Sequence, residues 1–257
     1  MIAAPDSPLV GALRPSPSFG ARRGGAVPSI LLLHYTGVAT AEKAISWLAD
    51  PASEVSCHYV VDEAGAVTQM VAEADRAWHA GQGAWAGDTD INSSSIGIEV
   101  HNVGHAAGYP DFPEAQIAAV IALCRDIVAR HRIRPERVLA HSDIAPQRKI
   151  DPGEKFPWHR LARAHVGHWV EPAPLEPSDA GIAPGAAGGL VADVQRKLAS
   201  YGYAIEASGT FDVATELVVA AFQRHFRPSR VDGRIDRSTI ATLDALTSAL
   251  PAAPVIA

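Results

Sequence analysis

The sequence is poor in cysteine, in charge of one sign and in long apolar runs, and each shortage excludes a class of protein. Its two cysteines, Cys57 and Cys124, are too few for a disulfide framework and lack C-x-x-C spacing. No apolar run approaches the length of a membrane span. A net charge of -6, with no block of lysine or arginine, argues against nucleic-acid binding.

The amino-terminal residues also lack the basic start and apolar stretch of a secretion signal, which predicts either a cytoplasmic protein or a chain without its signal. What is present is typical of a globular protein. Apolar residues make up 47% and charged residues 19% of the 257, so a substantial core is expected and general disorder is not. The length fits one large domain or a medium domain with a small one, and we expect a monomer.

A sharp change of composition after Trp169 divides the chain. Residues 171–189 are rich in proline, glycine and alanine and show no periodicity, which predicts a linker. We therefore expect one domain over residues 1–170 and a second, smaller domain over residues 190–257.

The first domain is predicted to be α/β, with a mixed central sheet flanked by helices. Two helices are expected, at 41–48 and at 113–131, and Asp111 with Glu114 is interpreted as a capping box for the second. Short apolar runs typical of buried strands lie at 30–33, 57–61, 66–71, 95–100 and 138–140.

The second domain is predicted to be a small three-helix bundle. Residues 209–215 and 233–239 align position for position, and each carries an aspartate suited to capping a helix, Asp212 or Asp236. With no cluster of ionisable groups expected here, binding is a more natural task than catalysis. The apolar stripe of the first helix is assigned to Leu190, Val194 and Leu198.

Two histidines and two acids suggest an open metal site. His34 and His141 each end a predicted strand, Asp151 follows His141 by ten residues, and Glu99 ends a third strand. Taken singly, each residue also fits an ordinary structural role, and Asp151 fits a turn before Pro152. Taken together, two imidazoles and one carboxylate leave a fourth zinc position open for water, which is the arrangement of a hydrolase.

The sequence motifs around these residues resemble those of a known family. The resemblance covers roughly residues 28–165 and is to the zinc-dependent N-acetylmuramoyl-L-alanine amidases, the type that includes peptidoglycan-recognition proteins. Within that type it is nearest to amidases that accept anhydro-muropeptides and carry a cell-wall-binding domain. The segments that carry it are 33–36 (Leu-His-Tyr-Thr), 56–59 (Ser-Cys-His-Tyr), 78–81 (Trp-His-Ala-Gly), 92–99 (Asn-Ser-Ser-Ser-Ile-Gly-Ile-Glu), 140–146 and 151–153 (Asp-Pro-Gly).

The carboxy-terminal region is similar to the three-helix peptidoglycan-binding domain, through residues 194–198, 201–203, 211–212 and 221–223. This resemblance makes peptidoglycan or muropeptides the expected partners. A wall-binding domain suggests the periplasm, whereas the missing signal suggests the cytoplasm and muropeptide recycling. Deleting residues 180–257 is expected to weaken binding to sacculi while sparing small muropeptides.

The resemblance implies one Zn²⁺ held by His34, His141 and Asp151. It also implies Glu99 as the acid/base group and Lys149 beside the developing oxyanion. The implied reaction is hydrolysis of the amide between N-acetylmuramic acid, including its 1,6-anhydro form, and the L-alanine of the stem peptide. The alternative is a peptidoglycan-binding protein without turnover, which would need neither the metal nor Glu99.

Four further residues are candidates for contact with the substrate. Tyr35 follows His34, and His58 lies on a strand from which it either faces the site or serves the structure. Trp78 and His79 are expected to form a shelf for a sugar or a stem peptide. His101 lies two residues after Glu99 but is excluded from the metal set, because the family pattern needs no histidine there.

Overall fold

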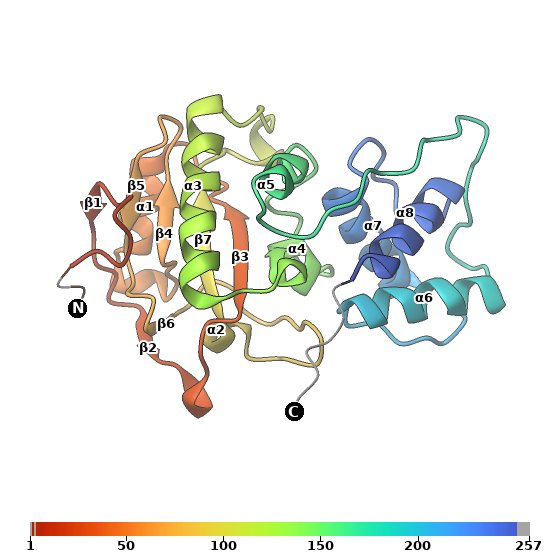
Figure 1. Cartoon of the computed structure of the whole chain (residues 1–257), viewed down its shortest axis with the longest axis horizontal. Coiled ribbons are helices and arrows are strands. Elements are labelled where there is room, and N and C mark those ends of the chain that lie inside the picture. The colour runs from red at the N-terminus through yellow and green to blue at the C-terminus, as the bar shows by residue number, and fades with distance from the viewer. Residues whose placement is uncertain (1, 3, 251–257) are drawn as a thin grey trace.

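The computed structural model describes residue 2 and residues 4–250, and its first part is built on a six-stranded sheet (Figure 1). The strand order is β1-β5-β4-β7-β3-β8, with only the β4–β5 pair antiparallel among these neighbours. The predicted α/β class with a mixed sheet is confirmed. The strands of the sheet are β1 Ala12–Leu13, β3 Ile30–Tyr35, β4 Tyr59–Val61, β5 Val67–Gln69, β7 Ser95–Val100 and β8 Val138–Ala140, and a separate antiparallel pair is β2 Phe19–Ala21 with β6 Asp75–Ala77.

Helices cover the sheet and form the second part of the chain (Figure 1). Figure 1 shows α3 lying across one face of the sheet, and α6 to α8 gathered beyond α4 and α5, on the far side of β3 from β1. Over the described residues, every helix is too short or too polar to span a bilayer. The helices are α1 Ala41–Leu48, α2 Ile91–Ser94, α3 Glu114–His131, α4 His141–Ile144, α5 Trp158–Arg163, α6 Gly189–Tyr201, α7 Val213–Phe226 and α8 Arg237–Ser248, with short 3-10 turns at Arg23–Gly25, Pro51–Ser53, His105–Ala107 and Pro135–Arg137.

The side chains of β3 alternate between two different apolar clusters. Leu31 and Leu33 are fully buried in the cluster that includes α3, whereas Ile30 and Leu32 belong to a cluster on the opposite face. A parallel strand covered on both faces needs such a continuous apolar run. By the same alternation His34 lies on the face of Leu32, so this face leads from apolar core directly into the site.

The cluster on that second face joins the two parts of the chain. It combines Leu32 and Trp85 of the α/β part with Val194 and Phe222 of the helical part, all of them at most 1% exposed. The two parts therefore share this buried core, while the cluster on the α3 face belongs to the α/β part alone.

The proline-rich segment 171–188 is held against the helical part. Ser238 Oγ donates to Ala173 O at 2.6 Å, and Ile182 forms a two-way backbone bridge with Ile235. The predicted bounds of the two domains remain predictions, and residues 1, 3 and 251–257 within them lie outside the described range.

The predicted capping box at the start of α3 is wrong. A capping box needs its glutamate at the third helical position, but α3 begins at Glu114 itself, with Pro113 before it and no side-chain cap. The carboxylate of Glu114 pairs with Arg160 at 2.5 Å, and that of Asp111 pairs with Lys155 at 3.1 Å.

In the helical part the predicted aspartate caps are confirmed, with Asp212 accepting from Thr215 N at 2.8 Å and Asp236 from Thr239 N at 2.6 Å. The prediction that Leu190 belongs to the apolar stripe of α6 is wrong. Leu190 is 49% exposed, and the neighbouring Val191, which is 2% exposed, lies in the buried stripe with Val194 and Leu198 instead.

The expectation that the helical part lacks a cluster of ionisable groups is also wrong. The buried Arg227 lies 3.2 Å from Asp236 Oδ2, and Arg230 pairs with the same carboxylate. Because Asp236 also caps α8, this cluster fastens the connection between α7 and α8 and has a structural explanation.

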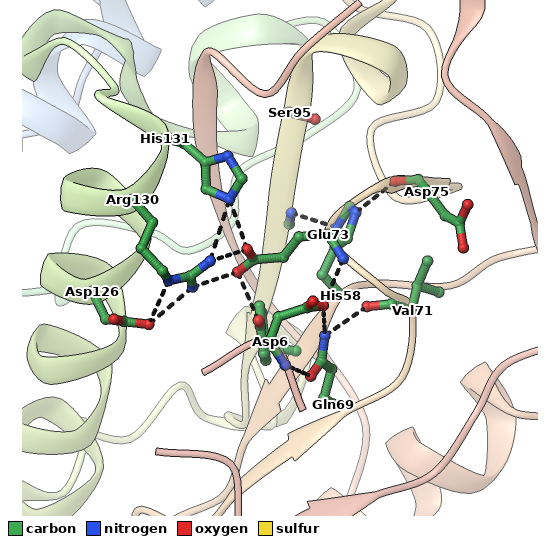
Figure 2. Close-up of polar contacts among 12 residues, drawn as sticks. Asp6, His58, Gln69, Val71, Glu73, Asp75, Ser95, Asp126, Arg130 and His131 are labelled. Atoms are coloured by element: carbon green, nitrogen blue, oxygen red, sulfur yellow. Dashed lines mark hydrogen bonds and ion pairs between the residues drawn. The ribbon is translucent and has the colours of Figure 1, made fainter. Parts of the chain in front are cut away.

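A further polar cluster, the Glu73 cluster, fixes the amino-terminal segment to the end of α3 (Figure 2). Glu73 accepts from Tyr59 OH at 2.7 Å and from Arg130, and it lies 2.7 Å from His131 Nε2. Asp6 reaches the same loop by accepting from Glu73 N at 2.9 Å. The cluster, which comprises these five residues, ties the loop between β5 and β6 to both segments.

Candidate metal centre and active-site cavity

Three neighbouring strands bring the predicted metal-site residues to one edge of the sheet. His34 on β3 is in register with Glu99 on the parallel strand β7, so both side chains project from the same face. On the other side of β3, Leu33 is in register with Ala140, and His141 follows immediately. The carboxyl ends of parallel strands are where α/β folds place their sites, as expected from the sequence.

The donor atoms of three residues converge. His141 Nδ1 lies 2.9 Å from His34 Nδ1 and 3.0 Å from Asp151 Oδ2, and His34 Nδ1 lies 3.3 Å from the same oxygen. Asp151 is brought back to this point because its carbonyl oxygen accepts from Ser142 N at 3.0 Å, which closes the loop after α4. The structure thus brings together His34, His141 and Asp151, all buried, with donor atoms mutually within 4.8 Å.

This donor set fits zinc. Two imidazole nitrogens and one carboxylate oxygen are typical zinc ligands, and ligands about 2.0–2.1 Å from a tetrahedral ion lie about 3.3 Å from one another. The observed separations of 2.9–3.3 Å approach that value. The three donors span one triangular face, which leaves a position for water or substrate.

A backbone carbonyl orients His141. His141 Nε2 lies 3.0 Å from Ala80 O, and since a carbonyl oxygen only accepts, Nε2 carries the proton and Nδ1 keeps its lone pair for a metal. Arg148 donates to the same oxygen at 3.2 Å. This contact keeps the carbonyl fixed beside the ring.

A relay of side chains orients His34. His34 Nε2 lies 3.0 Å from His79 Nδ1, His79 Nε2 lies 3.2 Å from Ser95 Oγ, and Ser95 Oγ donates to Ile91 O at 2.5 Å. One set of tautomers satisfies the whole chain and leaves His34 Nδ1 free for a metal. Gly97 makes room for the relay, because a Cβ at this position would lie 2.4 Å from His79 Nδ1.

The protonation states of the ligand set suit a metal. Burial and the neighbouring His141 lower the pKa of His34 to about 4, so its imidazole is neutral at pH 7. Burial alone would raise the pKa of Asp151, but His141 and His34 hold it well below its ordinary value. Neutral imidazole and ionised carboxylate are the forms that coordinate metals.

Glu99 is the spare carboxylate of the site. Its Oε2 is buried and accepts no hydrogen bond from any described residue. Burial raises the pKa of Glu99 well above its ordinary value, Asp151 raises it further, and Lys149 opposes both. A carboxylate at a cavity wall, with one buried, unused oxygen and a raised pKa, is suited to moving a proton.

The site opens into a cavity of about 470 Å³. Glu99, Lys149, Tyr35, Trp78 and His79 line it beside the three donors, as the sequence led us to expect of residues that contact the reacting groups or the substrate. His79 also has the second role of hydrogen-bonding His34, which the sequence did not suggest.

His58 is placed elsewhere. It is fully buried and does not line the cavity; its Nδ1 accepts from Gly97 N at 3.0 Å, and its Nε2 lies 3.2 Å from Asp75 O. We therefore do not retain His58 as a substrate contact, since both ring nitrogens are engaged with the backbone of Gly97 and Asp75, away from the cavity. His101 is also outside the site, as expected, because it bonds Thr36 and Glu63.

Among the cavity-lining residues that sequence reasoning did not identify are Trp47 and Arg148. Trp47 on α1 lines the cavity with its side chain 55% exposed, and Arg148 lies at its rim. Exposed tryptophan in an amphipathic helix was the available signal for Trp47. Nothing local in the sequence distinguishes Arg148 from a surface charge.

Known proteins share both parts of the chain. Residues 24–154 match the N-acetylmuramoyl-L-alanine amidase family, and residues 187–243 match a peptidoglycan binding domain family. The N-acetylmuramoyl-L-alanine amidase AmiD of Escherichia coli K12 is 40% identical over 229 residues, which cover 84% of this chain and 81% of AmiD. The 1,6-anhydro-N-acetylmuramyl-L-alanine amidase AmpD of the same organism is 31% identical over 60% of this chain and 91% of AmpD.

Solved structures agree over nearly the full length. AmiD in complex with anhydro-N-acetylmuramic acid-L-Ala-D-gamma-Glu-L-Lys superposes with a TM-score of 0.72 and 38% identity, covering 88% of this chain and 91% of that one. AmpDh3 of Pseudomonas aeruginosa superposes with a TM-score of 0.73 and 31% identity, covering 98% and 100%. The donor triangle, the spare glutamate and these similarities agree, and the chain belongs to the N-acetylmuramoyl-L-alanine amidase family.

Proposed function

We propose that the protein is a zinc-dependent amidase that cleaves the bond between N-acetylmuramic acid, including its 1,6-anhydro form, and the L-alanine of the stem peptide. The observation that carries the proposal is the triangle of His34 Nδ1, His141 Nδ1 and Asp151 Oδ2 beside the unpaired oxygen of Glu99. A protein that only binds peptidoglycan has no use for this set. The anhydro-muropeptide bound to AmiD and the anhydromuramic pentapeptide bound to AmpDh3 support the substrate class.

The proposed roles follow from position. His34, His141 and Asp151 would hold the ion, and what a bound Zn²⁺ supplies is Lewis acidity, which lowers the pKa of a water molecule toward about 7. Glu99 accepts a proton from the attacking water and delivers it to the departing amine nitrogen. The raised pKa of Glu99 makes its carboxylate a stronger base for the first transfer.

Lys149 provides positive charge at the same cavity wall. Its ammonium stabilises the negative charge that develops on the carbonyl oxygen of the scissile amide. Trp78 and Tyr35, also on the wall, are proposed to position the sugar and peptide portions. The helical part is proposed to bind polymeric wall, which would raise the local concentration of substrate.

The test is mass spectrometry of products from purified anhydro-muropeptides and from intact sacculi, with and without a chelator. We expect free stem peptide from both substrates, loss of turnover on chelation and recovery on adding Zn²⁺. Release of any other fragment would refute the assigned bond, and unchanged turnover with chelator would refute the metal.

A further inference from the structure

A buried carboxylate on α4 connects the helical part to the metal site. Asp143, whose side chain is 0% exposed, lies two residues after His141. It accepts from Ala140 N at 2.8 Å and from Tyr203 OH at 2.7 Å, and its Oδ2 lies 2.7 Å from His225 Nδ1. Two of these three contacts come from the helical part, 60 and 82 residues further along the chain.

These contacts are needed for the carboxylate to stay buried. An ionised carboxylate without partners is costly inside a protein, so its hydrogen bonds decide whether its local structure is stable. Over the described residues, the one ion-pairing partner of Asp143 is His225. The ring of His225 is itself fixed by stacking on Trp158 at 3.8 Å, so its Nδ1 is held toward the carboxylate.

Asp143 in turn fixes the backbone that carries His141. The helix α4 has four residues, begins at His141 and packs beside α7 (Figure 1). Because the carboxylate of Asp143 accepts from Ala140 N, it closes the turn on which the His141 side chain is mounted. A loss of this closure would move the His141 ring relative to His34 and Asp151.

The helical part also contacts the loop on the other side of His141. Ala80, whose carbonyl orients His141, begins a loop in which Ala86 N donates to Gly202 O at 2.8 Å. The contact is close, since a Cβ at Gly202 would lie 2.5 Å from Trp85 and its φ of +138° is unfavourable for other residues. Both segments that orient His141 are therefore held by the helical part.

We propose that Tyr203 and His225 are positioning residues of the metal site, so that the helical part, besides its proposed binding of the wall, holds His141 in place through Asp143. The proposal rests on His141 being a zinc ligand, as proposed above, and not on the identity of the substrate. The proposal also revises the expectation for the deletion of residues 180–257. That deletion would expose the shared core and leave Asp143 with Ala140 N as its one donor. We therefore expect it to reduce the hydrolysis of small muropeptides as well.

The test uses full-length protein with Tyr203→Phe and His225→Phe, singly and together. These changes keep an aromatic ring at each position but remove the groups that hydrogen-bond to Asp143. Tyr201→Phe is the matched control, because Tyr201 OH also bonds across the two parts, to His168 Nδ1 at 3.0 Å, but does not contact Asp143. His225→Asn is the rescue, since its amide places an N–H near the position of Nδ1.

The main measurement is zinc affinity by competition with a chelator. We expect the double variant to bind zinc about tenfold more weakly, in the range found when support of a metal ligand is removed. Its kcat on a soluble anhydro-muropeptide should fall with KM unchanged, and its sedimentation with sacculi should match the wild type. Tyr201→Phe and His225→Asn should stay close to wild-type zinc affinity.

A folded double variant with zinc affinity within twofold of the wild type would overturn the proposal, as would an equal loss in Tyr201→Phe. If the double variant does not fold, the zinc affinity of Tyr203→Phe, which removes a single oxygen, is compared with that of the wild type and of Tyr201→Phe instead. Wild-type protein that binds zinc without hydrolysing muropeptides would refute the proposed function, whereas the affinity comparison would still decide the role of Tyr203 and His225.

Discussion

Two glutamates, the buried Glu73 and the half-buried Glu99 at the cavity, show how one residue type serves opposite purposes in one molecule. In the Glu73 cluster both carboxylate oxygens have partners (Figure 2). Burial would raise the pKa of Glu73, but hydrogen bonds from Arg130, His131 and Tyr59 lower it to about 2. Its charge is therefore locked in place.

Glu99 is only half-buried as a residue, yet its Oε2 atom is buried without a partner. One oxygen has no partner among the described residues, and burial raises its pKa. The difference teaches that burial of a charge alone does not identify a site; the unused hydrogen-bonding capacity next to a cavity does.

The largest expected effect is that of Glu99→Gln on activity. We expect turnover of an anhydro-muropeptide to fall by about 10³, because the amide cannot move the proton. Zinc content should be unchanged and the melting temperature equal or higher, since a neutral group replaces a poorly solvated acid. Turnover within tenfold of the wild type would remove Glu99 from the chemistry and end the contrast with Glu73.

Glu73→Gln should do the reverse. Removing this charge leaves the guanidinium of Arg130 with Asp126 alone, and we expect a loss of about 3 kcal/mol in the free energy of unfolding. Activity per folded molecule should not change. Chemical denaturation measures the free energy of unfolding, and turnover of an anhydro-muropeptide divided by the number of zinc-binding sites measures the activity per folded molecule.

The same residue predicts how stability depends on pH. A carboxyl whose pKa is about 2 in the folded state and near 4.5 when unfolded contributes stability that is fully present above pH 4.5. That contribution is lost as pH falls from about 4.5 to about 2. Wild-type protein should therefore lose more stability over this interval than Glu73→Gln; parallel loss in both would show that Glu73 is not the group responsible.

Lys149→Met should reduce turnover by about 10², somewhat less than the loss of Glu99, because zinc would still polarise the carbonyl. Among the described residues Lys149 forms no ion pair, unlike Lys155 and Lys197, so stability should change little. The comparison is with Arg130→Met, which should lower stability and spare turnover. A large stability loss in Lys149→Met would make this lysine a structural residue.

Much of the site could be predicted because its key residues sit at strand ends. His34, Glu99 and His141 each follow an apolar run, and parallel strands bring their carboxyl ends to one edge whatever their distance in sequence. The periodicity of 113–131 likewise placed α3 to within one residue. In both cases local pattern and tertiary fold agree.

The features of the fold and the site that the sequence did not predict depend on contacts between residues far apart in the chain, which a local sequence pattern cannot show. His79 stands beside Trp78 in sequence, yet its partner His34 is 45 residues away. The strands β1, β2 and β6 have two or three residues each and lie among prolines or polar residues, so they have no usable periodicity. The role of Asp143 depends on a contact between the two parts of the chain.

The core shared by Leu32, Trp85, Val194 and Phe222 also determines how the enzyme can approach an insoluble wall. A binding module on a flexible linker reaches any point within a sphere, and linker length sets how often it does so. Packing of side chains instead fixes both the distance and the angle between the cavity and the wall segment that we propose the helical part binds. On that proposal, we expect cleavage of attached wall only at stem peptides a fixed distance from the bound segment, whereas free fragments meet no such restriction.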